Sequence, residues 1–270
     1  MKPMRIWVSG TSGNLGGEVA RQLRTAGHQV IEADVRSGTP VNLLDAEQVA
    51  RSMRGCEAIV HCAAIPSPEG QQPEHLVHNN VMSTLNALEQ AWRAGIRTAV
   101  LASSGSIYGT AWAPEPIPHA YVPVDEDTPL DYVDPYALSK DVLERMGEMY
   151  ARRGMTVTAL RFQWIITAEE VRRLRGEPVG PDDARNLWGY VELGDAAWAC
   201  VLALDPKPGH GRYQVLLITA ADTRAGQPIE ELLDTWCPDV PRRRELRGNQ
   251  AAFDCSRAAE VLGWYPTFIE

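Results

Sequence analysis

Hydrophobic and polar positions alternate between two spacings along the first 110 residues. Continuous apolar runs typical of buried strands lie at 5–10, 28–35, 57–64 and 97–104. Apolar residues at helical spacing occupy 16–26, 46–53 and 79–94. Strands that alternate with helices predict a parallel sheet with helices on both faces, and parallel strands buried on both sides are apolar throughout. We therefore predict an α/β fold with a doubly wound parallel sheet.

The pattern changes after residue 110. Residues 110–133 are rich in proline and acidic residues, which predicts a loop over the top of the sheet. The segment 166–190 is polar and rich in arginine. Further predicted strands lie at 155–162 and 213–219, and further predicted helices at 135–152, 168–175, 228–236 and 254–262, with a strand end and helix at 191–205.

Composition narrows the classes of function. The 270 residues suffice for one large domain with a small annex, and a net charge of -9 disfavours a nucleic-acid or anionic-membrane partner. No apolar run approaches the roughly 18 to 20 residues of a membrane span, and the N-terminus lacks the pattern of a signal peptide. We expect a cytoplasmic protein.

The sequence gives little support for a metal site or for a disulfide framework. The five cysteines are odd in number and scattered, which argues against a disulfide framework and a zinc site. His75 and His78 are three residues apart but have no third ligand nearby in sequence. We predict no metal.

The stretch VSGTSGNLGG places three glycines between the first strand and the first helix, at Gly10, Gly13 and Gly16. Glycines let the backbone approach a pyrophosphate closely, and the following helix N-terminus supplies N–H donors and a positive dipole. Because the turn opens a strand–helix unit, it predicts a dinucleotide site rather than a plain turn.

The next predicted strand ends at Asp34. A carboxylate there can accept hydrogen bonds from both ribose hydroxyls and would repel a 2′-phosphate, which favours NAD over NADP. Arg36 could pair with a 2′-phosphate and so leaves NADP as the less favoured cofactor.

The stretch DPYALSK places Tyr136 and Lys140 on one face of a predicted helix. A tyrosine needs about 3 units of pKa lowering to act as a base at pH 7, and a nearby cation can stabilise its phenolate. The chain has 26 lysines and arginines, of which only three are lysines, so a lysine here is notable. Serines at the end of the preceding strand, Ser103, Ser104 and Ser106, could hold a substrate oxygen beside the tyrosine.

Together these motifs resemble the extended short-chain dehydrogenases/reductases, the NAD-dependent epimerase/dehydratase family. The resemblance is carried by the glycine turn, Asp34, HCAA at 61–64, Asn80, SSGSIYG at 103–109 and YALSK at 136–140, and it continues through LRF, YVELGDAAWA and FDCSRAAEVLGWYP.

The resemblance implies a Rossmann-type fold with a small C-terminal substrate-binding lobe. The expected division is a core of residues 1–162 joined by 190–220, and a lobe of 163–189 and 221–270. It implies that Tyr136 is the catalytic acid/base, that Lys140 tunes it and anchors the ribose, and that Ser104 aligns the substrate. The implied cofactor-binding residues are Gly10, Ser12, Gly13, Asn14, Leu15, Gly16, Asp34, Val35, Asn42, Leu43, Cys62, Ala63, Ala64, Asn80, Tyr136 and Lys140.

Some positions bear on the subclass. The dehydratases of the family have acidic residues directly after the catalytic serine or threonine, whereas this chain has Gly105 and Ser106. Its short C-terminal lobe indicates a substrate smaller than a nucleotide sugar. The length and Arg185 resemble uronate dehydrogenases, which implies that Arg185 grips a substrate carboxylate. Ser106 is a candidate substrate contact because it lies at the end of a predicted strand. Gly105-Ser106 and Gln163-Trp164 depart from that pattern.

We therefore expect an NAD-dependent dehydrogenase of a small sugar or sugar acid, in which Tyr136 takes the hydroxyl proton. An epimerase that retains its cofactor and a non-catalytic NAD-binding sensor are the alternatives. The family resemblance also implies a homodimer.

Overall fold

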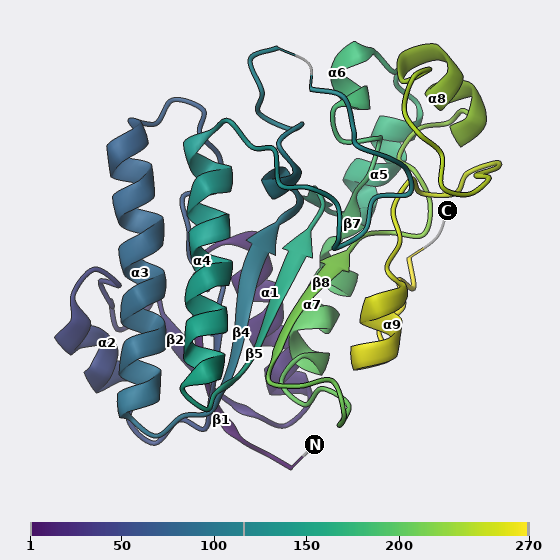
Figure 1. Ribbon diagram of the computed structural model, residues 1–270. Helices are drawn as coiled ribbons and strands as arrows, with labels where there is room; N and C mark the ends of the chain where they lie inside the picture. Colours follow the sequence, from purple (N-terminus) through teal and green to yellow (C-terminus); the bar gives the residue numbers. More distant parts are fainter. Residues whose placement is uncertain (1, 116, 269–270) are drawn as a thin grey trace.

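The computed structural model describes residues 2–115 and 117–268. Over these residues a central sheet has six strands in the order β2-β1-β3-β4-β5-β8, and every neighbouring pair is parallel (Figure 1). The strands are β1 (Arg5–Ser9), β2 (Gln29–Ala33), β3 (Ala58–His61), β4 (Thr98–Ser104), β5 (Thr156–Phe162) and β8 (Tyr213–Ile218). The strand order reverses at β1, which opens a crevice for a ligand beyond the carboxyl ends of β1 and β3. The predicted doubly wound sheet is confirmed.

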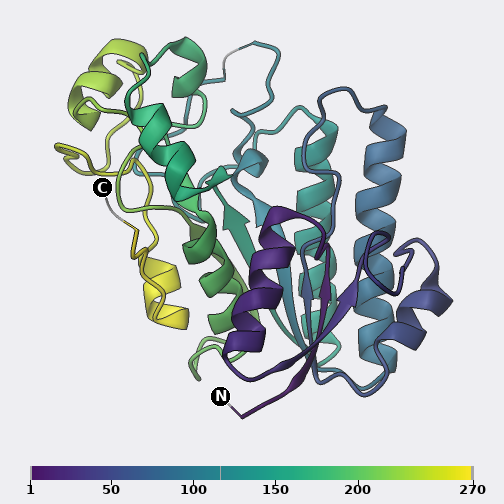
Figure 2. The same ribbon diagram turned by 180° about the vertical axis from the view of Figure 1, so that it is seen from behind.

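Alternating side chains of the strands supply a hydrophobic core on each face of the sheet. Ile6 and Val8 point into one core, and Trp7, which is fully buried, points into the other. The first core is covered by α1 (Asn14–Thr25) and α7 (Leu193–Leu202), and the second by α2 (Ala46–Ser52), α3 (Pro73–Arg93) and α4 (Pro135–Arg152) (Figures 1 and 2). Each large apolar side chain buried in this way stabilises the fold by about 1.5–3 kcal/mol.

The elements differ from the predicted ones mainly at their ends. Helix α3 begins at Pro73, six residues before the predicted start, because proline is well tolerated in the first turn of a helix. Three short elements were not predicted, namely the 3-10 helix η1 (Gly105–Tyr108), α6 (Pro181–Ala184) and the strand β6 (Ile165–Ile166), which pairs with the predicted strand end β7 (Val191–Glu192). They are too short to show a periodicity in the sequence.

The loop 110–133 is held against the C-terminal part of the chain. Val122 exchanges backbone hydrogen bonds of 2.8 Å with residues 241 and 243, and Val124 pairs in the same way with residues 252 and 254. A third hydrophobic core joins this loop to α6 and to α8 (Ile229–Trp236), while α5 (Ala168–Arg175) lies beside them. The loop and the C-terminal lobe therefore form one packed unit above the sheet.

The final helix belongs to the main core. In α9 (Ser256–Leu262), Ala258 and Val261 are buried in the same cluster as Ile6 and Val8. The segment 221–270, which we expected to lie wholly in the lobe, thus divides between the lobe and the core. None of the described helices is both long and apolar enough to cross a membrane.

Candidate active site

The glycine turn brings three segments into close backbone contact. Gly10 has a φ of 72°, and a Cβ added to it would lie 2.8 Å from the backbone nitrogen of Ala63. A Cβ on Gly16 would lie 2.3 Å from the carbonyl oxygen of Gly10. No side chain caps the N-terminus of α1, so its first N–H groups can point at a phosphate. The turn therefore fits the pyrophosphate of a dinucleotide.

Asp34 lies just beyond β2 and faces this turn. Its carboxylate accepts hydrogen bonds from the backbone N–H groups of Ser12, at 3.2 Å, and Arg36, at 2.8 Å. Burial alone would raise the pKa of Asp34, but these hydrogen bonds outweigh it and lower the pKa, so the carboxylate is ionised at neutral pH. The Arg36 side chain is 71% exposed, and its Nε lies 3.9 Å from the same carboxylate.

A pocket of about 170 Å³ opens beside Asp34. Its lining consists of Ala33, Asp34, Val35, Val41, Asn42, Leu43, Leu44, Ala63, Ala64, Ile65, Asn79 and Ser83. Six of these residues are among those expected to bind the cofactor, and they come from three separate segments of the chain. The mixed apolar and polar lining fits an adenosine group.

A buried hydrogen-bond chain fixes the ends of β1 and β3. The Ser9 hydroxyl oxygen accepts from the N–H groups of Cys62 and Ala63, so its proton is donated to Nδ1 of His61, 2.8 Å away. Nε2 of His61 then donates to Thr84, at 3.2 Å. Burial, reinforced by the charge of Lys140, lowers the pKa of His61 to about 3. His61 is therefore a neutral structural residue.

Asn80 continues this network toward the catalytic helix. Its side-chain amide bonds to both the N–H and the carbonyl of Ile65, at 2.8 and 3.1 Å, and donates to the Ser139 hydroxyl at 3.1 Å. Ser139 in turn donates to the carbonyl of Tyr136. Asn80 thus ties the loop after β3 to the helix that carries Tyr136.

The three expected catalytic residues come together at the carboxyl end of β4. Tyr136 and Lys140 lie on the inner face of α4 with 9% and 4% of their surfaces exposed, and the lysine Nζ is 5.5 Å from the centre of the tyrosine ring. The ammonium donates to the carbonyl of Ala102, at 2.7 Å. Ser104 is the last residue of β4, and its side chain acts to lower the pKa of Tyr136.

Burial dominates the protonation of this cluster. It raises the pKa of Tyr136 to about 12, with Ser104 acting against the rise and Asp134 adding to it. Burial also lowers the pKa of Lys140 to about 8, so the lysine remains largely protonated at pH 7. The sequence led us to expect that Lys140 would lower the pKa of Tyr136. The pKa of Tyr136 is instead raised, because desolvation of the phenolate outweighs the hydrogen bond from Ser104 that acts to lower it, and the tuning of Tyr136 by Lys140 stays a prediction.

A buried ion pair holds the end of β4 through Ser103, the residue before Ser104. Arg161 of β5 donates two hydrogen bonds to the Glu144 carboxylate, at 2.9 and 2.8 Å, and Ser103 donates to the same carboxylate at 2.7 Å. Arg161 also donates to the backbone carbonyl of Glu126, at 3.1 Å. The network therefore joins β4, α4, β5 and the loop above the sheet.

The two remaining predicted residues differ in position. The Ser106 hydroxyl oxygen is buried next to Ser104 and has no hydrogen-bond partner among the described residues. Arg185 instead donates to Asp182, at 3.2 Å, and to the carbonyl of Ala113, at 2.5 Å. Arg185 thus ties α6 to the loop 110–133.

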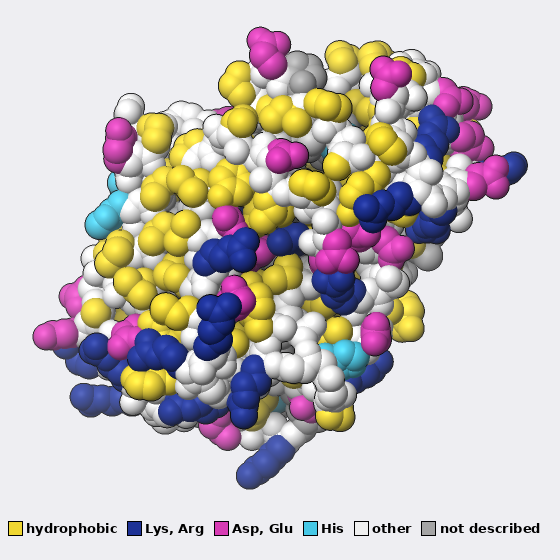
Figure 3. Space-filling view, in the orientation of Figure 1, with side chains coloured by type: hydrophobic (Ala, Val, Ile, Leu, Met, Phe, Trp, Pro, Cys, Tyr) yellow, Lys and Arg dark blue, Asp and Glu magenta, His cyan; other side chains and the backbone are white. Residues whose placement is uncertain are grey.

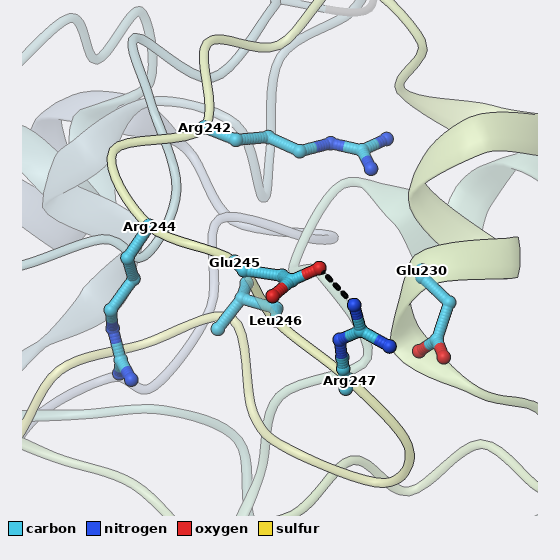
Figure 4. A pocket seen from close by; sticks show the side chains of 6 residues that line it. All are labelled: Glu230, Arg242, Arg244, Glu245, Leu246 and Arg247. Atoms are coloured by element: carbon cyan, nitrogen blue, oxygen red, sulfur yellow. Dashed lines mark hydrogen bonds and ion pairs between the residues drawn. The ribbon is translucent and has the colours of Figure 1, made fainter.

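A larger pocket of about 420 Å³ lies on the C-terminal lobe and contains no predicted site residue (Figure 4). It is lined by Glu230, Arg242, Arg244, Glu245, Leu246 and Arg247. Glu245 and Arg247 form an ion pair across it, and Arg242 pairs with Asp234 at 2.5 Å. Carboxylates thus compensate much of its positive charge.

Comparison with known proteins places the fold and the glycine turn in a family. The model of the NAD dependent epimerase/dehydratase family matches residues 6–215. The chain belongs to this family. NAD is the cofactor of the family, in agreement with the prediction, and the chain is therefore an NAD-dependent enzyme of the epimerase and dehydrogenase type.

Its relatives carry out more than one reaction. The chain is 30% identical to a UDP-glucose 4-epimerase of Mycolicibacterium smegmatis over 313 aligned residues, which cover 97% of this chain and 94% of the epimerase. It is 28% identical to an L-arabinose 1-dehydrogenase (NAD(P)(+)) of Haloferax volcanii over 232 residues, 82% of this chain and 90% of that protein. A short-chain dehydrogenase/reductase superfamily structure from Agrobacterium tumefaciens with bound NAD shares the fold, with a TM-score of 0.73 at 23% identity and coverage of 98% and 93%.

Some residues of the site were not identified from the sequence. Ser9 and Thr84, which orient His61, look like ordinary strand and helix residues until the fold brings them together. Gln163 was noted only as a departure from a family pattern. Its position directly after a buried strand, level with the serines that end β4, is the signal that could have identified it.

Proposed function

We propose that this enzyme oxidises a hydroxyl-bearing carbon of a small sugar or sugar acid. Bound NAD supplies the acceptor for the hydride and a positive charge close to the reacting carbon. Tyr136 accepts the proton of the substrate hydroxyl, and Ser104 donates a hydrogen bond to the substrate oxygen. Lys140 stabilises the phenolate and the ribose. The products are a carbonyl compound, reduced cofactor and one proton.

The arrangement of Ser104, Tyr136 and Lys140 carries this proposal. The three side chains meet beyond the end of β4, next to the crevice that the glycine turn and Asp34 line. Since burial raises the pKa of Tyr136, its use as a base requires the extra positive charge that oxidised cofactor provides. Gly105 and Ser106 offer no carboxyl group for the elimination of water, which supports oxidation over dehydration.

The cofactor contacts follow from the same geometry. We assign the pyrophosphate to the turn from Gly10 to Gly16, the adenosine ribose to Asp34, and the adenine to the pocket formed by Val35, Asn42 and Leu43. Cys62, Ala63 and Ala64 back the ribose phosphate, and Asn80 holds the loop that presents them. The ionised Asp34 favours NAD over NADP, since a 2′-phosphate would meet its negative charge.

A small substrate is supported by the lengths of the relatives. The match to the M. smegmatis epimerase spans 313 aligned residues, whereas this chain has 270, so the epimerase carries segments that this chain lacks. The match to the arabinose dehydrogenase spans 232 aligned residues, fewer than the 270 of this chain. Between β5 and β7 the chain contributes only residues 163–190 to the substrate lobe. For Arg185 to grip a carboxylate, it would have to exchange its bond to Ala113 for the substrate.

The second candidate is an epimerase that retains its cofactor and returns the hydride to the other face of the sugar. The identity to UDP-glucose 4-epimerases over most of the chain favours it. Incubation of the purified enzyme with NAD and a panel of aldoses, uronates and UDP-sugars separates the two. Continuous accumulation of NADH at 340 nm is expected. Inversion of a sugar without free NADH would replace the dehydrogenase with the epimerase.

We also propose that the enzyme is a homodimer formed through α3 and α4. Hydrophobic side chains gather over the upper part of these two helices (Figure 3). Leu138 and Met149 of α4, both large and apolar, are 40% and 41% exposed. Replacement of both by glutamate should convert a dimer into a monomer in sedimentation velocity. A monomeric wild-type protein would contradict the proposal.

A further inference from the structure

The register of the sheet places Gln163 beside the catalytic serine. Ser104, the last residue of β4, is paired with Phe162, the last residue of β5. The backbone N–H of Gln163 extends the pairing by donating to the carbonyl of Ile218, at 3.1 Å. Gln163 therefore lies at the level of Gly105, one residue past Ser104, at the edge where a parallel sheet binds its ligands.

The side chain of Gln163 occupies the space that a side chain at position 105 would need. A Cβ added to Gly105 would lie 2.2 Å from Nε2 of Gln163 and 2.7 Å from its Cδ. The φ of Gly105 is not in the left-handed region, so the backbone does not require glycine there. The missing side chain at 105 instead makes room for the amide of Gln163.

The amide of Gln163 has no hydrogen-bond partner among residues 2–115 and 117–268, and although the residue as a whole is 8% exposed, its amide atoms remain in reach of solvent. On the other side of Gly105, the buried hydroxyl oxygen of Ser106 is likewise unpaired within the described chain. A buried polar group without a partner costs about 1–3 kcal/mol. The unpaired hydroxyl of Ser106 and the solvent-accessible amide of Gln163 flank the residue after Ser104, which indicates a ligand that bonds to both.

We propose that the Gln163 amide positions the substrate by hydrogen bonding a hydroxyl on the carbon next to the one that is oxidised. This inference rests on the proposed function. A primary amide both donates and accepts, and a hydroxyl does the same, so the two groups can satisfy each other. The chemical class recognised is a vicinal diol, in which one hydroxyl lies at Ser104 and Tyr136 and its neighbour lies at Gln163.

The test compares Gln163→Met with the wild-type enzyme on a sugar and on its mono-deoxy analogues. Methionine keeps the length of glutamine but removes the amide. With the parent sugar, kcat/KM for NADH formation should fall roughly 10- to 100-fold. For the wild-type enzyme, kcat/KM should fall by the same factor when one deoxy analogue replaces the parent sugar. On that analogue the variant and the wild type should have equal kcat/KM. A purely structural role for Gln163 would lower activity equally on all analogues.

Two further variants serve as controls. Gly105→Ala should push the amide aside and cause a loss of similar size, and the double variant Gly105→Ala/Gln163→Met should lose little more than either single variant. Gln71→Met, at an exposed loop position, should behave as wild type. The Kd for NAD, followed by fluorescence, should be unchanged in all of them.

The outcomes separate this inference from the proposed function. If wild-type enzyme forms NADH and Gln163→Met matches it on every analogue, the inference is wrong and the proposed function stands. If wild-type enzyme forms no NADH, the proposed function fails, and a thermal shift by sugar in the presence of NADH then tests Gln163. The shift should be lost in Gln163→Met and with the same deoxy analogue. Wild-type enzyme that binds no sugar would overturn both.

Discussion

Two regions at the carboxyl edge of the sheet, one beyond β1 and β3 and the other beyond β4 and β5, differ in how their polar groups are hydrogen-bonded. We call them the cofactor end and the substrate end. Beyond β1 and β3, Ser9, His61 and Asn80 are paired within the protein, and glycines bring backbone against backbone. Beyond β4 and β5, the hydroxyl of Ser106 and the amide of Gln163 have no partner in the described chain. The first end can be closed and rigid because its ligand is the cofactor common to the family. The second end keeps hydrogen-bonding groups open, as the proposed substrate site requires.

The largest expected effect is on kcat and comes from a substitution at the substrate end. Tyr136→Phe removes the phenolate oxygen that accepts the substrate proton, so kcat should fall about 10²- to 10⁴-fold. The Kd for NAD should change little, because the cofactor end is intact. Steady-state NADH formation and NAD titration measure the two quantities. Tyr265→Phe, at a position that is 65% exposed, is the matched control. Retained activity in Tyr136→Phe would exclude Tyr136 as the base.

The buried lysine between the two ends should affect stability as well as catalysis. The pKa of Lys140 falls from an ordinary value of 10.5 to about 8 in the folded protein, so the unfolded chain binds more protons between these values. The wild-type free energy of unfolding should therefore rise by about 3 kcal/mol as pH increases through that window. The rise should be missing in Lys140→Met. Urea unfolding of the cofactor-free protein at pH 7 to 10.5 measures it, and parallel curves for the two proteins would contradict it.

Gly16→Ala tests the close packing of the cofactor end. Its Cβ would meet the Gly10 carbonyl at 2.3 Å, so the turn must shift. The free energy of unfolding should fall by about 1–3 kcal/mol, and NAD should bind at least roughly tenfold more weakly. Gly38→Ala, where nothing lies within 4 Å of the added Cβ, is the control. Wild-type NAD affinity in Gly16→Ala would show that the turn does not hold the pyrophosphate.

The smallest expected effect concerns the choice of dinucleotide. Asp34→Asn removes the charge that repels a 2′-phosphate, so the ratio of kcat/KM for NAD to that for NADP should fall about tenfold, or about 1.4 kcal/mol. Arg36→Ala in the same background should cancel part of the gain in NADP use. An unchanged ratio in Asp34→Asn would transfer the preference to other residues of the pocket.

Local patterns explain why much of the site was predictable. The glycine turn, the strand-end Asp34 and the pair Tyr136 and Lys140 each lie within a few residues of an element that the hydrophobic pattern defines. A parallel sheet places all such strand ends along one edge, so their proximity follows once the strands are recognised. The sequence did not predict the start of α3 at Pro73, because residues 73–78 lack a strong apolar periodicity.

The properties that depend on long-range contacts were not predictable in this way. Burial reverses the expected direction of the pKa shift of Tyr136, and burial is a property of the packed molecule. The amide of Gln163 and the missing side chain of Gly105 are 58 positions apart, and only the register of β4 with β5 brings them into contact.

By itself the sequence determined the alternation of strands and helices and the candidates for the dinucleotide turn and the reactive side chains, because each depends on the spacing of neighbouring residues. Only the tertiary structure decided which polar groups are satisfied, which remain open beside Ser104, and how strongly burial holds Tyr136 protonated. These properties depend on solvent exclusion and on contacts between distant segments, which a linear pattern does not encode.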